Sequence, residues 1–190
     1  MNKFDYLSWV TLDRFVEIRS RWATFIGEHL QDDAGKILDY WRVEKEDSVI
    51  ILPIQNQQFL FPVPMYRPGV GERTLDFPGG RVPVGKTPVE IAPIILKREL
   101  GILENSIISL SPVNSEGWAI DSSFSNQKVY GFVATINQNF LVNAELLGAT
   151  YPINQQGISG LLNDLTCLQC RSLLLEFRNY TATDCTDGHW

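Results

Sequence analysis

The stretch "GGRVPVGKTPVEIAPIILKRELGI", residues 79–102, contains the strongest local signals of the chain. Thr87 can cap a helix, Pro88 suits the first helical position, and Glu90 completes a capping box. These signals predict a helix over residues 88–100. The apolar residues of this helix are expected to pack into the core, and its charged residues are the candidates for chemistry.

Sequence signals also mark the end of the predicted helix and the loop that precedes it. Gly101 supplies a stop signal at its carboxyl end. The loop over residues 79–85 contains three glycines and leads into the helix amino terminus, a place where phosphate can bind. Pro93 lies inside the helix, where it removes one hydrogen bond at a cost of about 3 kcal/mol or introduces a kink.

Strand signals surround this helix. Two β-rich runs, residues 22–29 and 36–44, are separated by the turn "DDAG" and predict a hairpin. Further apolar and β-branched runs on both sides of the central helix favour more strands. The segment 159–180 has leucines at helical spacing and predicts one terminal helix. This order favours an α+β fold or an α/β/α sandwich over alternating βαβ units.

Composition narrows the possible functions. The chain has 190 residues and a formal net charge of −6, which argues against nucleic-acid binding. It contains no apolar run of the ~20 residues needed to span a bilayer and no leader-like amino terminus, so we expect no membrane partner and a cytoplasmic location.

The central stretch resembles the signature of the Nudix hydrolases, G-x5-E-x7-R-E-U-x-E-E-x-G-U, where U is aliphatic. The residues in register are Gly80, Leu96, Glu99, Gly101 and Ile102. The segments "WATFIGEHLQDDAGKILDYWRVE", "VPMYRPGVGERTLDFPGG" and "SEGWAIDSSFSNQKVYGFVA" look like parts of the ADP-ribose pyrophosphatase branch. The resemblance therefore covers roughly residues 22–180 and implies the Nudix fold, an α/β/α sandwich with a mixed sheet.

The resemblance also implies an organisation and a reaction. It implies an amino-terminal hairpin region, residues 1–45, used to form a homodimer, and a Nudix-fold domain over residues 46–190, the two making one compact unit. Proteins of this kind cleave a pyrophosphate that joins a nucleoside to another group, as in ADP-ribose. They use Mg²⁺ held by glutamates of the box helix.

The box of this chain departs from the signature at most of its chemical positions. Lys86 replaces the first glutamate, Ile94 the arginine, and Ile95 and Arg98 two further glutamates. Glu99 is the box glutamate that remains, so we assign to it any catalytic role and a weak metal-binding role. Positions 95, 98 and 99 share one helix face, and there a hard cation such as Mg²⁺ would meet one carboxylate instead of three.

Three functions stay open from the sequence. The first is a catalytically impaired pseudoenzyme that binds an ADP-ribose-like nucleoside diphosphate without metal. The second is an active hydrolase that uses Mg²⁺ through non-standard ligands, drawn from Glu72, Glu90, Glu104, Glu116 or Asp121. The third is a structural or protein-interaction domain with an empty pocket. Whether the protein is an enzyme is therefore left open.

For the binding function, the predicted ligand-contacting residues are Arg67, Gly79, Gly80, Lys86, Arg98 and Trp118. Arginine can hold phosphate through paired hydrogen bonds and lysine acts as a compact charge. Arg67 is assigned to the pocket by resemblance. Lys86 and Arg98 could equally be solvated surface residues.

The cysteines allow two interpretations. Cys167 and Cys170 form a C-x-x-C pair, and Cys185 and His189 follow as C-x-x-x-H. Such a set could hold zinc. The same cysteines could be reduced packing residues of an amphipathic helix.

Overall fold

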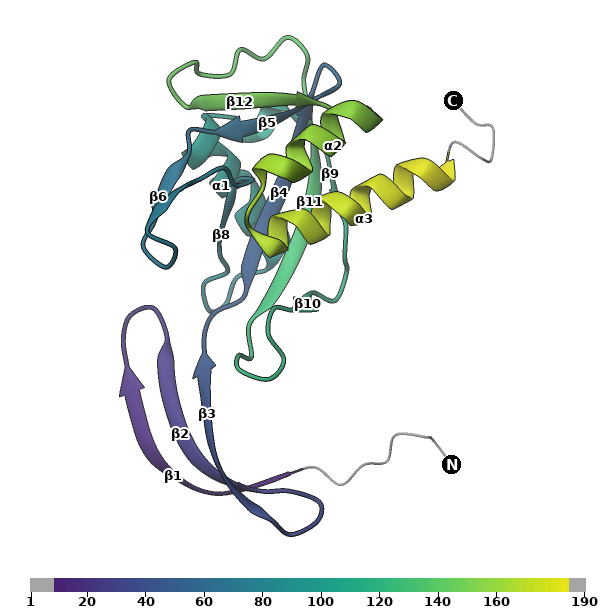
Figure 1. Cartoon of the computed structure of the whole chain (residues 1–190). Helices are drawn as coiled ribbons and strands as arrows, with labels where there is room; N and C mark the ends of the chain where they lie inside the picture. The colour runs from purple at the N-terminus through teal and green to yellow at the C-terminus, as the bar shows by residue number, and fades with distance from the viewer. Residues whose placement is uncertain (1–8, 185–190) are drawn as a thin grey trace. The chain divides into compact units, whose positions relative to one another are not determined.

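The computed structural model describes residues 9–184, which form two compact units (Figure 1). One unit consists of the chain up to Glu46 together with Ala119–Lys128, and the other of Asp47–Trp118 together with the chain from Val129 onward. Each unit has its own sheet, so each is described by itself.

The amino-terminal unit is an antiparallel sheet in the order β1-β2-β3, made of β1 (Val10–Arg19), β2 (Thr24–Gln31) and β3 (Ile37–Glu44). Strands β2 and β3 form the predicted hairpin. Asp32 closes its turn, since its Oδ1 accepts hydrogen bonds from the backbone N–H groups of Ala34 and Lys36 at 2.9 and 2.8 Å. Strand β1 is an addition that the sequence patterns did not predict.

The larger unit contains a mixed sheet with strand order β10-β11-β4-β5-β12, in which β8 also pairs with β4 and β9 with β11. Strands β11 and β4 are parallel, and the pairings of β9, β5, β12 and β8 are antiparallel. A mixed sheet was predicted, and it is confirmed. The strands are β4 (Ser48–Gln55), β5 (Gln58–Pro62), β8 (Gly79–Arg81), β9 (Ile107–Pro112), β10 (Trp118–Ala119), β11 (Lys128–Ile136) and β12 (Leu147–Pro152).

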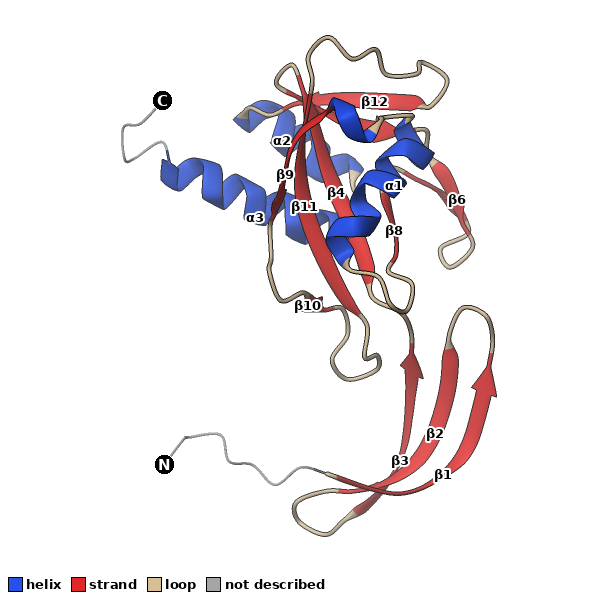
Figure 2. Ribbon diagram, turned by 180° about the vertical axis from the view of Figure 1, so that it is seen from behind, coloured by secondary structure: helices blue, strands red, loops and turns tan. Residues whose placement is uncertain are grey.

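Helices cover both faces of this sheet, as Figures 1 and 2 show. Helix α1 (Pro88–Leu100) lies on one face, and α2 (Gln155–Asp164) and α3 (Leu168–Asp184) lie on the other. A short ribbon of β6 (Met65–Arg67) and β7 (Glu72–Thr74) flanks the sheet, and a 3-10 turn, η1 (Glu104–Ser106), follows α1. This arrangement is the predicted α/β/α sandwich.

Helix α1 has the predicted bounds. The Glu90 carboxylate accepts a hydrogen bond from the Thr87 N–H at 2.8 Å, and Gly101 ends the helix with a φ of 70°. Pro93 is accommodated within this single helix. The inner face of α1 packs into the core through Ile91, Ala92, Ile95, Leu96 and Leu100.

The terminal helix was predicted as one element over residues 159–180, and this prediction is wrong. Residues 165–167 are not helical and divide the segment into α2 and α3. Arg171 explains the break, because its guanidinium donates hydrogen bonds to the carbonyl oxygens of Leu162 and Leu165 at the carboxyl end of α2. The buried side chain of Leu165 fixes the connection.

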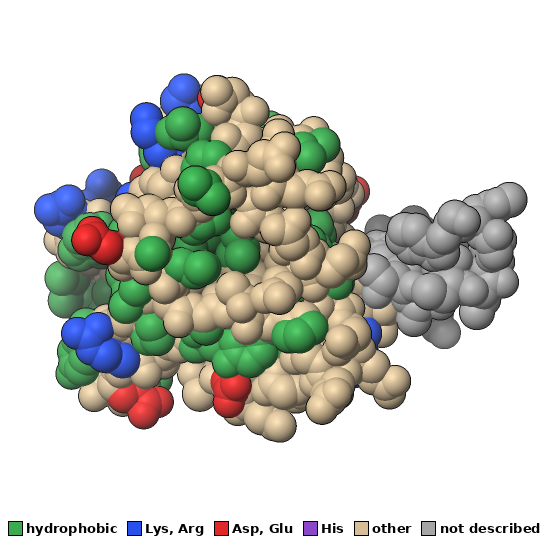
Figure 3. Space-filling view, turned by 90° about the horizontal axis from the view of Figure 1, so that it is seen from above, with side chains coloured by type: hydrophobic (Ala, Val, Ile, Leu, Met, Phe, Trp, Pro, Cys, Tyr) green, Lys and Arg blue, Asp and Glu red, His purple; other side chains and the backbone are tan. Residues whose placement is uncertain are grey.

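Charged side chains are unevenly distributed on one face of the molecule. On the face shown in Figure 3, Lys and Arg side chains lie mostly toward one margin, and hydrophobic and uncharged polar groups make up the centre. Among the described residues, no helix is long and apolar enough to cross a membrane.

Candidate functional site

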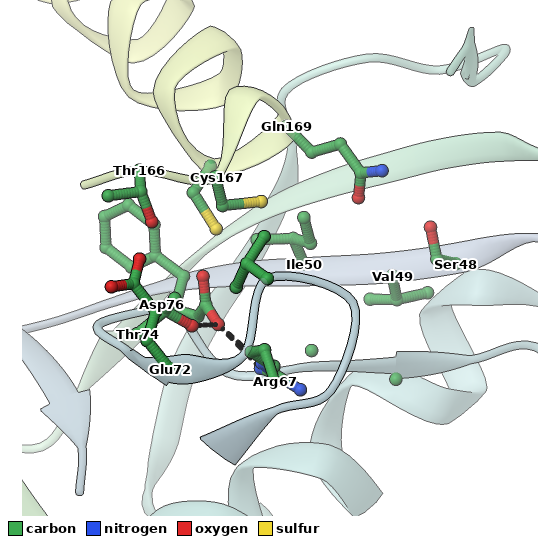
Figure 4. A pocket seen from close by; sticks show the side chains of 15 residues that line it. Ser48, Val49, Ile50, Arg67, Glu72, Thr74, Asp76, Thr166, Cys167 and Gln169 are labelled. Carbon is green, nitrogen blue, oxygen red and sulfur yellow. Dashed lines mark hydrogen bonds and ion pairs between the residues drawn. The ribbon is translucent and has the colours of Figure 1, made fainter. Parts of the chain in front are cut away.

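A cavity of about 460 Å³ opens in the larger unit. Its wall is built by β4, the β6–β7 ribbon, the segment that leads into β8, and the start of α3 (Figure 4). Strand β4 lies beneath it and is part of the buried sheet, so the cavity has a rigid floor. The charged and sulfur-bearing side chains in the wall are Arg67, Glu72, Asp76, Cys167 and Cys170.

Arg67 lies in the cavity wall, as predicted, but its charge is already partnered. Its Nε and Nη2 atoms each lie 2.8 Å from Oδ2 of Asp76, and the Thr74 hydroxyl donates to the same oxygen at 2.7 Å. Figure 4 shows these contacts beneath Cys167. Glu72 and Asp76 each carry a negative charge and Arg67 carries one positive charge, so the formal net charge of these three residues is negative.

Gly79 and Gly80 also line the cavity, and their positions are fixed by α1. The Gly79 N–H donates to Oε2 of Glu99 at 3.1 Å, while Arg98 Nη2 donates to the Gly79 carbonyl at 2.8 Å and to Oε1 of Glu99 at 2.5 Å. A Cβ on Gly80 would lie 3.1 Å from Ile95 Cδ1, so glycine permits this close packing. The surviving box acid therefore anchors β8 to α1.

The other predicted contact residues lie elsewhere. Lys86 forms a 3.5 Å ion pair with Glu90 at the start of α1 and does not line the cavity. Trp118 lines a separate hollow with Pro112, Val113 and Glu176. The structure thus brings Arg67, Gly79 and Gly80 together in one cavity wall, places Arg98 and Glu99 against Gly79, and leaves Lys86 and Trp118 outside it.

The box helix does not offer a fitting magnesium site. Mg²⁺ binds oxygen ligands in near-octahedral geometry. Here Ile95 is buried in the core, which leaves Glu99 as the one carboxylate at these positions, and its two oxygens accept hydrogen bonds from Gly79 and Arg98. Among the acids considered as replacements, Glu72 lines the cavity, whereas Glu116 lines the separate hollow with Trp118.

Sequence reasoning missed that the C-x-x-C pair belongs to this cavity. Cys167 directly precedes α3 and Cys170 lies in its first turn, beside Asp76 from the β7–β8 connection. One ligand atom of each of these three residues lies within 4.8 Å of the other two. The C-x-x-C spacing was visible in the sequence, but no local signal linked it to a residue about ninety positions earlier.

The two thiols differ in their acidity. A hydrogen bond from the Cys170 thiol, together with backbone N–H groups at the start of α3, lowers the pKa of Cys167 to about 6, despite partial burial and the nearby Asp76. The same interaction and burial raise the pKa of Cys170. At neutral pH the pair therefore consists of a thiolate at residue 167 and a thiol at residue 170.

Alkylation of Cys167 by iodoacetamide is expected to reach half its maximal rate near pH 6, since the thiolate is the nucleophile and its pKa is about 6. An ordinary cysteine would show this midpoint near pH ~8.5. The measurement is peptide-resolved mass spectrometry of metal-free protein across pH. Cys170→Ala removes the donated hydrogen bond and should move the midpoint upward; a wild-type midpoint above pH ~8 would contradict the assignment.

Of three comparisons with known proteins, the one with solved structures found matches. Searches with models of protein families and against curated proteins found no match. A crystal structure described as an ADP compounds hydrolase superimposes with a TM-score of 0.75, covering 94% of this chain and 97% of that chain at 22% sequence identity. The two chains share a fold. At this identity the likeness concerns the fold alone, and it confirms the fold predicted from the sequence.

Proposed function

We propose that this protein is a catalytically impaired Nudix-fold protein that binds a nucleoside diphosphate derivative such as ADP-ribose. The observation that carries the proposal is the lack of free carboxylates on the face of the box helix that would bind the metal. Ile95 belongs to the core, and Glu99 is neutralised by Arg98 and tied to Gly79. The helix face that would hold Mg²⁺ in the family carries no group of free carboxylates among positions 95, 98 and 99.

The ligand class is supported by two independent likenesses. The sequence resembles the ADP-ribose pyrophosphatase branch of the Nudix hydrolases, and the fold is shared with an ADP compounds hydrolase. We assign the diphosphate to the side of the cavity formed by Gly79 and Gly80. Arg98 does not line the cavity itself but contacts Gly79, and its 57% exposed side chain has N–H groups in addition to the one that holds Gly79. Arg67 would then contact the sugar or phosphate from the β6–β7 ribbon.

A second function is an active hydrolase with non-standard metal ligands. Glu72 and Asp76 favour it, because their carboxylates line the cavity and could take over a metal from the box helix. Mg²⁺-dependent turnover would distinguish this function from the first. Ligand binding of any kind would exclude the third possibility, an interaction domain with an empty pocket.

We further propose a cytoplasmic homodimer formed through the amino-terminal hairpin region, residues 1–45. Its sheet exposes large apolar side chains from all three strands, a pattern common at protein interfaces. Phe25 stacks on Trp41 with ring centroids 5.0 Å apart, and Phe15 meets Trp41 edge-on at 5.3 Å. The exposed members are Val10, Leu12, Phe15, Ile18, Trp22, Phe25, Ile37 and Trp41.

The proposal is tested by calorimetric titration of ADP-ribose into the full chain, first in chelator and then with excess Mg²⁺. We expect saturable binding in chelator and no continuous heat of hydrolysis with Mg²⁺. Continuous heat would instead identify an active enzyme. No binding in either condition would leave the interaction domain.

The role of Arg98 is tested by Arg98→Ala, which should weaken ADP-ribose binding about 10-fold or more, the usual loss for a charge-assisted hydrogen bond. Lys97→Ala is the matched control: it removes an exposed cation of the same helix turn and should leave affinity within about 2-fold of wild type. Thermal unfolding of both variants checks that the fold is retained. Equal affinities in wild type and Arg98→Ala would reject the fixed-cation mechanism.

A further inference from the structure

Three potential metal ligands converge at the cavity wall, and none of them belongs to the box helix. Asp76 comes from the connection between β7 and β8, Cys167 directly precedes α3, and Cys170 lies in the first turn of α3. We propose that these three residues bind one thiophilic divalent cation of the zinc class, with a fourth coordination position open to the cavity. The site uses none of the residues of the Nudix-like box.

The separations suit a tetrahedral ion. Zinc–sulfur bonds of ~2.3 Å and zinc–oxygen bonds of ~2.0–2.2 Å place neighbouring ligand atoms about 3.5–3.8 Å apart. The carboxylate oxygen and the two sulfurs already lie within 4.8 Å of one another, so small side-chain rotations close the site. The C-x-x-C spacing places both sulfurs on one side of the helix start, as in many zinc sites.

Asp76 is positioned as a metal-binding carboxylate usually is. Its Oδ2 accepts hydrogen bonds from Arg67 at 2.8 Å and from Thr74 at 2.7 Å, which fixes the side chain and leaves Oδ1 for a metal. Such hydrogen bonds behind a ligand are typical of zinc centres. The Asp76 side chain is only 12% exposed, so its orientation is determined by the protein.

The ligand chemistry selects the kind of ion. Thiolates favour zinc and other soft or borderline ions, whereas magnesium and calcium require oxygen-rich sites. Binding through both sulfurs requires Cys170, which is 1% exposed, to release its proton as the cation binds, because a second thiolate beside Asp76 is more negative charge than Arg67 can balance. A divalent cation supplies the missing positive charge. Because all three residues line the cavity, its fourth ligand would be water or an oxygen of a bound molecule.

The test is a titration of reduced, chelator-treated full-length protein with Co²⁺, followed by displacement with Zn²⁺. The expected result is one Co²⁺ per chain, a thiolate-to-cobalt charge-transfer absorption, visible bands of tetrahedral strength, and loss of both when zinc is added. Failure of the reduced protein to bind Co²⁺, or a purely octahedral spectrum without charge transfer, would overturn the proposal. So would a disulfide between the two cysteines that a dithiol reductant does not open.

Variants distinguish this site from other arrangements. Cys167→Ser, at a partly exposed position, should weaken Co²⁺ binding at least about 100-fold, and Asp76→Asn about 10-fold or more. Cys185→Ser is the control: it removes the cysteine outside the described residues and should leave the spectrum unchanged. Wild-type binding by either ligand variant, or loss of the spectrum in Cys185→Ser, would overturn the three-ligand assignment.

The stability of each variant is checked by circular dichroism before titration. A Cys167→Ser protein that is folded but does not bind Co²⁺ supports the site, and one that is folded and binds normally refutes it. If Cys167→Ser does not fold, Asp76→Asn provides the same decision. The titration contains no nucleotide, so its outcome is independent of ADP-ribose binding.

Discussion

Replacing Ile95 with glutamate, which restores the acid of the Nudix signature, is expected to destabilise the protein by about 4 kcal/mol or more at pH 7. Ile95 is 1% exposed and packs with Leu96 and Ile91 against the sheet. A carboxylate fully buried in apolar surroundings has its pKa raised by up to ~3–5 units, and each unit corresponds to ~1.36 kcal/mol. The loss of apolar burial adds to this penalty.

The neighbouring residue provides the control. Ile94 is 56% exposed, so Ile94→Glu places the same charge on the same helix turn in water and should change stability by no more than about 0.5 kcal/mol. Denaturant unfolding of both variants at several pH values is the measurement. Because the buried carboxyl would have a raised pKa, the Ile95→Glu deficit should shrink as pH falls toward 4, where the carboxyl becomes neutral in both states.

This expectation changes how the missing box acids are understood. Lys86→Glu, Ile95→Glu and Arg98→Glu together would restore three acids of the signature, and Pro93 by itself is a reason to expect only part of the metal affinity to return. The structure gives a stronger reason for poor recovery, because position 95 belongs to the core. If Ile95→Glu were as stable as Ile94→Glu, the face of α1 assigned to the core would be wrong.

Replacing Gly131 with alanine is expected to destabilise the protein by about 3 kcal/mol, at the upper end of the usual range for overpacking. Gly131 lies in β11, and a Cβ there would lie 2.1 Å from Cδ2 of Leu173 in α3. Leu173 is fully buried, so it has little room to rotate away. The absence of a side chain at residue 131 therefore sets how closely α3 approaches the sheet.

A double-mutant cycle tests this contact. Leu173→Ala alone should cost about 2–5 kcal/mol, and adding Gly131→Ala to it should cost little more, since the clashing atoms are gone. Gly160→Ala in α2 is the control, because a Cβ there meets nothing within 4 Å, and it should be neutral or slightly stabilising. Additive costs in the double variant would show that the two residues do not meet.

Local signals predicted the elements that depend on local chemistry. Thr87, Pro88, Glu90 and Gly101 gave the bounds of α1 because caps and stops act within a few residues. The break before α3 was missed, because leucine spacing continues through it while Arg171 caps the earlier helix from outside the pattern. Helical periodicity shows which residues share a face and not where the backbone is interrupted.

The candidate site was less accessible to sequence reasoning. Arg67 was assigned to the pocket by resemblance, and Gly79 and Gly80 were predicted to contact the ligand from the loop before α1; the structure groups all three in the cavity wall. Their part in binding stays a prediction. The proximity of Asp76 to Cys167 depends on how α3 packs on the sheet, a tertiary property without a spacing rule. The alternative zinc set with Cys185 and His189 cannot be placed, since both residues lie outside the described residues.

The interruption between α2 and α3 has an electrostatic consequence. In one continuous helix, the N–H groups of Gln169 and Cys170 would be bonded to carbonyl oxygens four residues earlier. The three non-helical residues free these groups at the start of a new helix, where the peptide dipoles give a partial positive charge. They are the backbone donors that stabilise the Cys167 thiolate. The change of backbone path therefore adds to the effect of the Cys170 thiol, whose hydrogen bond is the largest cause of the lowered pKa of Cys167.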